Sequence, residues 1–220
     1  MGKVISFIND KGGVAKSTST VCLASYLMAE GKRVAVVDVD ARHSCLDWAA
    51  LADRSDYPTP LMVGNSNASV GSNILKLKED YDFVLVDGMS SFVTSGRRDV
   101  IASIIKATDY ILIPTRPDPI DLWALAELTD MVKSRQEIAN GSPKTWIFGS
   151  AVRDHTNEWK EFIQAKEDAP FPLLNAYLPY SVDFPRTTGK GQSPLVLAES
   201  NNSRKALIAW AEEIKEIINE

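Results

Sequence analysis

The chain of 220 residues contains little of several features that mark specialised protein classes. Its two cysteines, Cys22 and Cys45, have no metal-ligand spacing, and its two histidines, His43 and His155, stand alone. No apolar run approaches the ~18 residues of a membrane span, and no basic stretch followed by an apolar run indicates a signal peptide. So few cysteines in so long a chain predict a reduced, cytosolic protein with a core that needs no disulfides.

An excess of positive charge is also missing, since 24 basic residues face 29 acidic ones and the net charge is −5. The chain as a whole is therefore not a basic nucleic-acid binder, and any contact with DNA would need a local patch. Residues 184–205 hold four basic residues against the single acid Glu199. The candidates for such a patch are Arg153, Arg186, Lys190, Arg204 and Lys205. Scattered, solvated surface charges are the alternative interpretation.

What the chain does contain is an alternation of short apolar runs and helical stretches. Runs rich in Val and Ile predict strands at residues 3–9, 33–40, 82–88, 110–115 and 145–152. Helices are predicted at residues 16–30, 95–107, 121–140, 154–168 and 203–219. This order predicts one α/β domain over residues 1–220, with a mostly parallel, twisted sheet flanked by helices on both faces.

The tryptophans and the last helix extend this prediction to the core. Trp48, Trp123 and Trp210 are expected in the core, whereas Trp159 is expected on an exposed helix face. In the last helix an apolar stripe is predicted to face the domain: Leu207, Trp210, Ala211, Ile214, Ile217 and Ile218.

A glycine-rich loop, "KGGVAKST" at residues 11–18, lies between the first strand and the first helix. In this setting backbone N–H groups and the positive end of the helix dipole can bind phosphate. Lys16 would reach the β- and γ-phosphates, Ser17 would bind Mg²⁺, and Thr18 would donate to the α-phosphate. The nucleotide contacts predicted from the loop itself are Gly12, Gly13, Val14, Ala15, Lys16, Ser17 and Thr18. A glycine turn followed by a helix cap is the simpler alternative.

Ala15 stands where such a loop usually has glycine before its lysine. Alanine fits at little cost if this position has negative φ, and costs ~1 kcal/mol or more if φ is positive. We expect the site to bind ATP even so, because Lys16, Ser17 and the helix start remain.

Acidic residues follow two other strands. Asp38 and Asp40 end the second run and Asp87 ends the third. Buried strands have little reason to carry unpaired acids, and ligands of parallel α/β folds bind at the carboxyl ends of strands. These acids are therefore predicted to lie near a bound nucleotide and its Mg²⁺, the alternative being that they cap the next helix or turn.

With Lys11 included, the loop resembles the ParA/MinD family of deviant P-loop ATPases, whose pattern is K-G-G-x-G-K-[ST]. The likeness extends to "VAVVDVDARHSCLDWAALA", "YDFVLVDGMSS", "ATDYILIPTRPDPIDLWAL" and "FPRTTGKGQSPLV". The small ParF-like partition ATPases are the most similar group, and they lack an N-terminal DNA-binding extension. Two positions depart from the family's D-x-D-P-Q segment, where Ala41 replaces Pro and Arg42 replaces Gln.

The resemblance implies specific roles. Lys11 would reach across an ATP-bound homodimer to the phosphates of the partner, and Lys11, Lys16 and Asp40 would be catalytic, with Asp40 orienting the attacking water. Ser17, Asp38 and Asp87 would form the Mg²⁺ site. Pro117, in "RPDP" with Asp118 and Pro119, is expected under the adenine, although a proline-rich turn is an equal alternative.

The resemblance also implies partners. ATP would drive dimerisation and non-specific, salt-sensitive DNA binding, and a small dimeric ParB/ParG-like DNA-binding protein would stimulate slow hydrolysis and release. Nucleoid association in the cytoplasm follows from this. The last helix carries Glu212, Glu213, Glu216 and Glu220, so membrane binding is not expected.

The predicted function is therefore an ATP-dependent DNA (plasmid) partition ATPase. One alternative is a ParA-like ATPase that positions a protein cargo. The other is a nucleotide-binding scaffold with little turnover, for which Ala15 is the reason. Iron–sulfur reductases of the same superfamily are disfavoured, because neither cysteine is placed to bridge two subunits.

Overall fold

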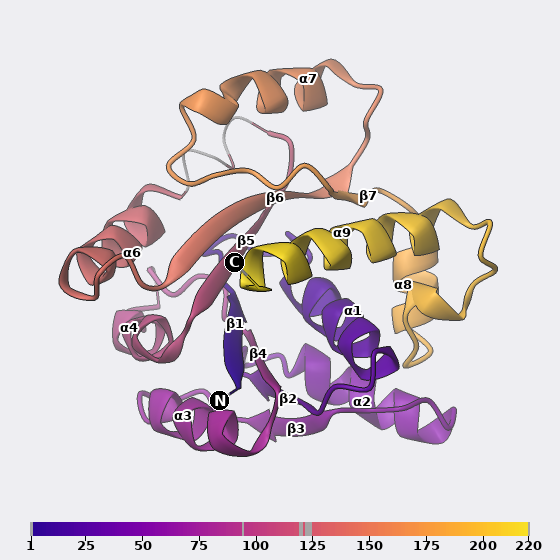
Figure 1. Cartoon of the computed structure of the whole chain (residues 1–220), viewed down its shortest axis with the longest axis horizontal. Coiled ribbons are helices and arrows are strands. Elements are labelled where there is room, and N and C mark those ends of the chain that lie inside the picture. The colour runs from indigo at the N-terminus through magenta and orange to yellow at the C-terminus, as the bar shows by residue number, and fades with distance from the viewer. Residues whose placement is uncertain (1, 94, 119–120, 122–124, 220) are drawn as a thin grey trace.

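In the described part of the chain, seven strands form one parallel sheet in the order β3-β2-β4-β1-β5-β6-β7 (Figure 1). This computed structural model describes residues 2–93, 95–118, 121 and 125–219. The strands are β1 Lys3–Phe7, β2 Val34–Asp38, β3 Leu61–Gly64, β4 Phe83–Asp87, β5 Tyr110–Thr115, β6 Lys144–Val152 and β7 Leu178–Pro179. The expected parallel α/β fold is confirmed.

Helices cover both faces of this sheet (Figure 1). The longer helices are α1 Lys16–Ala29, α2 Ser44–Arg54, α3 Val70–Asp80, α4 Arg98–Ala107, α6 Ala126–Ile138, α7 Asn157–Gln164 and α9 Asn202–Asn219. A short helix, α8 Asp183–Thr188, and the 3-10 turns Ala165–Glu167 and Pro194–Val196 complete the described elements. Among the described residues no helix is long and apolar enough to cross a membrane.

Each face of the sheet has its own hydrophobic core, because side chains of successive strand residues point to opposite faces. Ile5 and Phe7 of β1 pack with α1, α2 and α9, whereas Val4 of the same strand packs with α3, α4 and α6. Trp210 of α9 is fully buried in the first core and contacts the rings of Phe7 and Phe148. The predicted stripe of α9 is confirmed, with Ile217 partly buried and the other members buried.

All five predicted strands are present, and two further strands were missed. β3 has four residues at the sheet edge and β7 has two, so neither provides a long apolar run. Helices α2 and α3 were also missed, because each buries only three residues and so provides a short apolar pattern. Trp48 is buried as expected, while Trp123 lies outside the described residues. The expectation for Trp159 was wrong, since its ring stacks on Phe162 and contacts Tyr177.

The sheet brings the polar strand ends together. β4 lies between β1 and β2, and its last residue, Asp87, is in register with Phe7 of β1 and with Asp38 of β2. The loops after β1, β2 and β4 therefore leave the same edge of the sheet side by side. This edge carries the phosphate-type loop and all three predicted acids.

Candidate nucleotide-binding site

The loop between β1 and α1 is held in place by buried polar contacts. The Asn9 side chain is fully buried, donates to the carbonyl of Pro114 at 2.9 Å and accepts from the backbone N–H of Lys11 at 2.9 Å. The backbone N–H groups of residues 12–14 donate to no described residue. This loop therefore offers backbone donors at the start of a helix, the arrangement that binds phosphate.

Lys16, the first residue of α1, points back into the loop. Its Nζ donates to the carbonyl oxygens of Asn9 at 3.0 Å and Lys11 at 2.9 Å. Burial lowers the pKa of this ammonium, while the charge of Asp87 acts in the opposite direction. A phosphate in the loop would supply a stronger acceptor for this buried lysine than two carbonyls do.

Ala15 has left-handed backbone geometry, with φ 66° and ψ 26°. This is the unfavourable case of the two considered from sequence, because a left-handed conformation costs a residue with a Cβ about 1–2 kcal/mol. Its carbonyl nevertheless accepts the N–H of Ser19 at 2.9 Å and so begins the hydrogen bonds of α1. The loop geometry is thus retained with alanine, under local backbone strain.

Lys11 pairs with Asp121 of the same chain. The Lys11 side chain is 38% exposed and that of Asp121 is 1% exposed. The second oxygen of Asp121, Oδ2, has no hydrogen-bond partner among the described residues. Sequence reasoning missed Asp121, because 110 positions separate the two residues and only the β5 connection brings them together.

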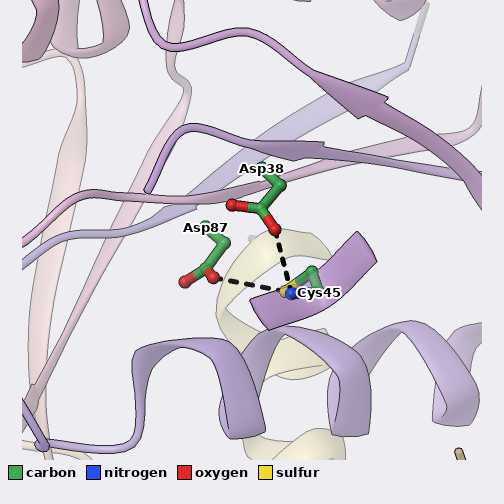
Figure 2. Close-up of side chains that lie close together, drawn as sticks. All are labelled: Asp38, Cys45 and Asp87. Atoms are coloured by element: carbon green, nitrogen blue, oxygen red, sulfur yellow. Dashed lines mark hydrogen bonds between the residues drawn. The ribbon is translucent and has the colours of Figure 1, made fainter. Parts of the chain in front are cut away.

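Asp38, Asp87 and Cys45 form a buried cluster at the ends of β2 and β4 (Figure 2). One oxygen of Asp38, Oδ2, accepts the backbone N–H groups of Cys45 at 2.9 Å and Leu46 at 3.2 Å. The thiol of Cys45 donates to Asp87 Oδ2 at 3.2 Å, whereas Asp87 Oδ1 has no hydrogen-bond partner among the described residues. Burial raises the pKa of Asp38, and it raises that of Asp87 to about 7.

The donor set fits a hard divalent cation, because carboxylate and hydroxyl oxygens are the protein ligands that Mg²⁺ prefers. The Ser17 side chain, in the first turn of α1, interacts with the Asp87 carboxylate, whose Oδ1 has no hydrogen-bond partner among the described residues. The contacts of Asp38 also fit the alternative that this acid caps the next helix. Its carboxylate accepts two backbone N–H groups at the start of α2. Asp38 therefore has a structural partner in the chain, and Asp87 Oδ1 has none among the described residues.

Asp40 follows β2 at the edge of the same site and is half-buried. Its Oδ2 accepts the backbone N–H of Ser90 at 3.2 Å and its hydroxyl at 3.3 Å, while Oδ1 accepts the backbone N–H of Arg42 at 3.0 Å. These contacts hold the carboxylate in one orientation between the loops that follow β2 and β4. Ser90 was not identified from the sequence.

A mostly apolar cavity of about 270 Å³ adjoins the loop. Ala15 and Thr18 form its wall on the loop side, and residues 178–182, 184 and 185 with Ala151 and Thr188 form the rest. Its size and lining suit a planar heterocycle attached to a phosphate chain. Pro117 does not line this cavity, Pro119 lies outside the described residues, and the expected role of Pro117 stays a prediction.

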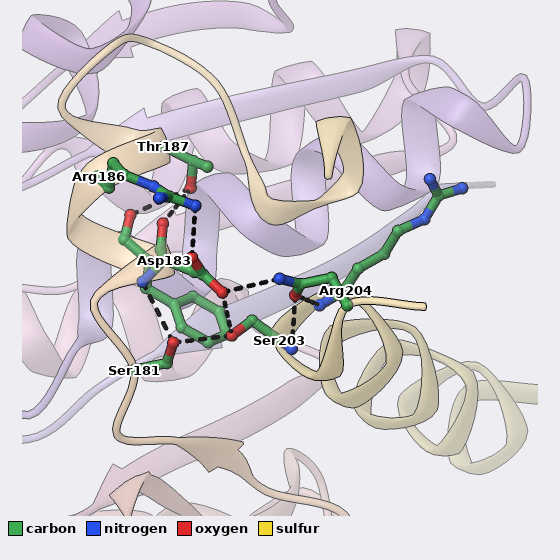
Figure 3. Close-up of polar contacts among 8 residues, drawn as sticks. Ser181, Asp183, Arg186, Thr187, Ser203 and Arg204 are labelled. Carbon is green, nitrogen blue, oxygen red and sulfur yellow. Dashed lines mark hydrogen bonds and ion pairs between the residues drawn. The ribbon is translucent and has the colours of Figure 1, made fainter. Parts of the chain in front are cut away.

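The basic residues predicted to contact DNA do not belong to the cluster of Asp38, Asp87 and Cys45. Three of these basic residues have contacts within the chain. Arg186 pairs with Asp183 at 2.6 Å, and Figure 3 shows Arg204 extending away from that pair. Arg204 donates to the carbonyl of Leu197 at 2.7 Å. The Arg153 guanidinium lies over the ring of Tyr180, 4.3 Å from its centroid. Lys190 and Lys205 are exposed.

Comparisons with known proteins agree with this geometry. A family model described as an AAA domain matches residues 2–57, which include the phosphate-type loop, Asp38 and Asp40. The chain is 24% identical to "Maintenance of carboxysome distribution protein A" from Halothiobacillus neapolitanus, over 98% of this chain and 94% of that protein. It is 27% identical to Protein ParA from Rhizobium radiobacter, over 69% of this chain and 68% of that protein.

A solved structure shares the whole fold. The septum site-determining protein MinD from Pyrococcus horikoshii, complexed with Mg-ADP, superimposes with a TM-score of 0.74 at 20% identity. The match covers 99% of this chain and 98% of the MinD chain.

Proposed function

Because the chain belongs to the ParA/MinD family of P-loop ATPases, we propose that it is a positioning ATPase driven by MgATP. ATP binding would form a homodimer that holds DNA non-specifically, and hydrolysis would release it. One observation carries the proposal. Buried Lys16, the first residue of α1, interacts electrostatically with Asp87, whose Oδ1 lacks a partner among the described residues.

The proposal assigns described residues to each part of MgATP. The loop N–H groups and Lys16 would bind the β- and γ-phosphates, and the apolar cavity beside Thr18 would take the base. Ser17 and Asp87 would hold Mg²⁺, which neutralises phosphate charge, and Asp38 would support them. Asp40, fixed by Ser90 and Arg42, would orient the attacking water.

Lys11 supports the dimeric form of the proposal. In the single chain it is engaged with Asp121 rather than with its own loop. A partner's phosphates would offer Lys11 an alternative acceptor, and the difference between these acceptors lets ATP favour the dimer. Lys11 would therefore leave Asp121 when two chains meet.

Two cargoes are proposed. A plasmid, joined through a ParB/ParG-like protein, is supported by the likeness to Protein ParA. A protein assembly is supported by the likeness to a carboxysome distribution protein over almost the full length of both chains. Deletion of the gene separates them, because unchanged plasmid retention with misplaced protein bodies would support the protein cargo.

The enzymatic core of the proposal is tested by ATP turnover and light scattering of the purified full chain, with and without DNA. Lys11→Ala is expected to bind ATP but to form no ATP-dependent dimer, whereas the exposed-lysine control Lys32→Ala dimerises normally. Normal dimers in Lys11→Ala would overturn the proposed role of Lys11. Wild-type protein that binds ATP without hydrolysing it would instead support the scaffold alternative, for which the strained Ala15 is the reason.

A further inference from the structure

Cys45 lies inside the candidate site, but the proposed ATPase chemistry does not use its thiol. The side chain is fully buried at the first turn of α2. Its sulfur and one carboxylate oxygen each from Asp38 and Asp87 all lie within 4.8 Å of one another. Three elements that are separate in the sequence, β2, α2 and β4, thus converge with three potential metal ligands (Figure 2).

A second observation indicates that this cluster holds a ligand. Asp87 is fully buried, yet its Oδ1 accepts no hydrogen bond from a described residue. A buried carboxylate oxygen without a partner is costly and rare in native proteins. A cation bound to both carboxylate oxygens of Asp87 would remove this cost, because it would occupy Oδ1 as well as the Oδ2 that faces the sulfur. Mg²⁺ would satisfy the oxygen, but a hard cation gains nothing from the neighbouring sulfur.

We propose that Cys45, Asp87 and Asp38 form a binding site for one thiophilic divalent cation of the Zn²⁺ type. Zn²⁺ accepts both thiolate sulfur and carboxylate oxygen, with three protein ligands and water in an open tetrahedral position. Bond lengths of about 2.0–2.3 Å place tetrahedral ligands about 3.5 Å apart. The observed 3.2 Å between Cys45 Sγ and Asp87 Oδ2 is close to that separation.

Binding is balanced in protons and nearly balanced in charge. The metal–sulfur bond forms as the thiol proton leaves to solvent, because thiolate is the metal ligand. One thiolate and two carboxylates then surround a 2+ ion, which leaves one negative charge. The Lys16 ammonium, which interacts electrostatically with Asp87, offsets that charge.

The bound ion would tie the start of α2 to the ends of β2 and β4. It would also occupy Asp87, so the Zn²⁺ form and the MgATP form would exclude each other. This consequence rests on the proposed function, whereas the metal site itself does not.

Cobalt is the probe for the test, because thiolate-bound Co²⁺ has a near-ultraviolet charge-transfer absorption that oxygen-bound Co²⁺ lacks. Nucleotide-free, full-length protein is titrated with Co²⁺ and then with Zn²⁺. We expect the band to saturate at one equivalent, to be lost on adding one equivalent of Zn²⁺, and to be absent in Cys45→Ser. Cys22→Ser is the matched control, since Cys22 is also a buried free cysteine but is not part of the Asp38–Cys45–Asp87 cluster, and it should leave the band unchanged.

Thermal melting gives a second measurement and checks folding. Zn²⁺ is expected to raise the Tm of wild type and Cys22→Ser, and not that of Cys45→Ser. Should Cys45→Ser not fold, Asp87→Asn retains the thiol and is expected to bind Co²⁺ at least tenfold more weakly. Absence of the band in wild type, its persistence in folded Cys45→Ser, or unchanged affinity in Asp87→Asn would overturn the proposal. The cobalt titration contains no nucleotide. Absence of the cobalt band in wild type would therefore contradict the metal site and leave the ATPase proposal standing. Absence of ATP turnover would contradict the ATPase proposal and leave the metal site standing.

Discussion

Two aspartates show how differently two polar regions of this molecule are built. Asp87, at the end of β4, is fully buried and has an oxygen without a described hydrogen-bond partner. Asp183, at the start of α8, has partners on both oxygens, with Asn201 and Ser203 donating to Oδ2 and Arg186 donating to Oδ1 (Figure 3). Burial raises the pKa of Asp87 to about 7, while the hydrogen bond from Asn201, followed by the one from Ser203, lowers that of Asp183.

The difference teaches how to separate a ligand site from a structural network. The strand-end region, around Asp38 and Asp87, holds buried polar groups that the chain leaves incompletely paired. Leaving a buried polar group unpaired is unfavourable unless a ligand binds to it. The α8–α9 region pairs both oxygens of Asp183 internally, and these contacts join the loop after β7 to the start of α9, although Arg204 Nε has no hydrogen-bond partner among the described residues. Arg186 and Arg204 belong to this second region, although the sequence made them candidates for DNA contact.

The largest expected effect is at the strand-end region. Lys16→Ala removes the buried ammonium that would stabilise charge on the transferred phosphate. We expect ATP turnover to fall by about 10²–10³-fold, as for loss of a preorganised electrostatic contact. Steady-state ATPase assays measure this, with Arg186→Ala expected to retain turnover within about twofold. Equal losses in both variants would break the distinction between the two regions.

The next effect is on the pH dependence of stability. The raised pKa of Asp87 means that the folded chain holds an extra proton between pH 3.8 and about 7. Stability associated with this group is therefore present below pH 3.8 and is lost as the pH rises to about 7. Asp87→Asn should stabilise the nucleotide- and metal-free protein at pH 8 by on the order of a few kcal/mol, and less at pH 5. Urea unfolding at both pH values measures it.

Asp183→Asn is the matched comparison and has the opposite sign. The lowered pKa of Asp183 contributes stability above its ordinary value of 3.8, and that stability is lost as the pH falls through the lower folded-state value. We expect this variant to destabilise the protein at pH 8. If both variants shifted stability in the same direction at pH 8, the contrast between the two carboxylates would be wrong.

A smaller effect is expected on DNA binding. Lys190 and Lys205 are exposed, whereas Arg186 is paired with Asp183. Each lysine-to-alanine change should weaken binding to DNA of any sequence and reduce the salt slope by about 1, while Arg186→Ala should change the slope less. Fluorescence anisotropy across a salt series, with ATP present, measures both. Binding that persisted at high salt would count against a phosphate contact.

The smallest effect is expected at Ala15. Ala15→Gly removes the left-handed strain at φ 66° and makes the unfolded chain more flexible, and these contributions oppose each other. We expect a net stabilisation of about 0.5–1 kcal/mol, measured by urea unfolding, with ATP affinity unchanged or tighter. Absence of ATP binding in wild type, rescued by glycine, would show that strain at Ala15 disables the site.

Much of the fold could be predicted because its signals are local. The runs around β1, β2, β4, β5 and β6 are apolar and continuous, since both sides of those strands are covered. The edge strand β3 and the two-residue β7 carry no such signal. Tertiary packing alone forms the apolar cavity, because Ala15 and Thr18 meet residues 178–182, 184 and 185 only in the folded chain.

The sequence by itself determined the phosphate-type loop, because "KGGVAKST" places its glycines, lysines and helix start within eight consecutive positions. It also placed Asp38 and Asp87 at strand ends. Only the tertiary structure decided that these two carboxylates stand in register and that Cys45 lies beside them. It also decided that Lys11 pairs with Asp121 and that Arg186 pairs with Asp183. Strand register and helix packing set these contacts, and neither is written in the spacing of residues along the chain.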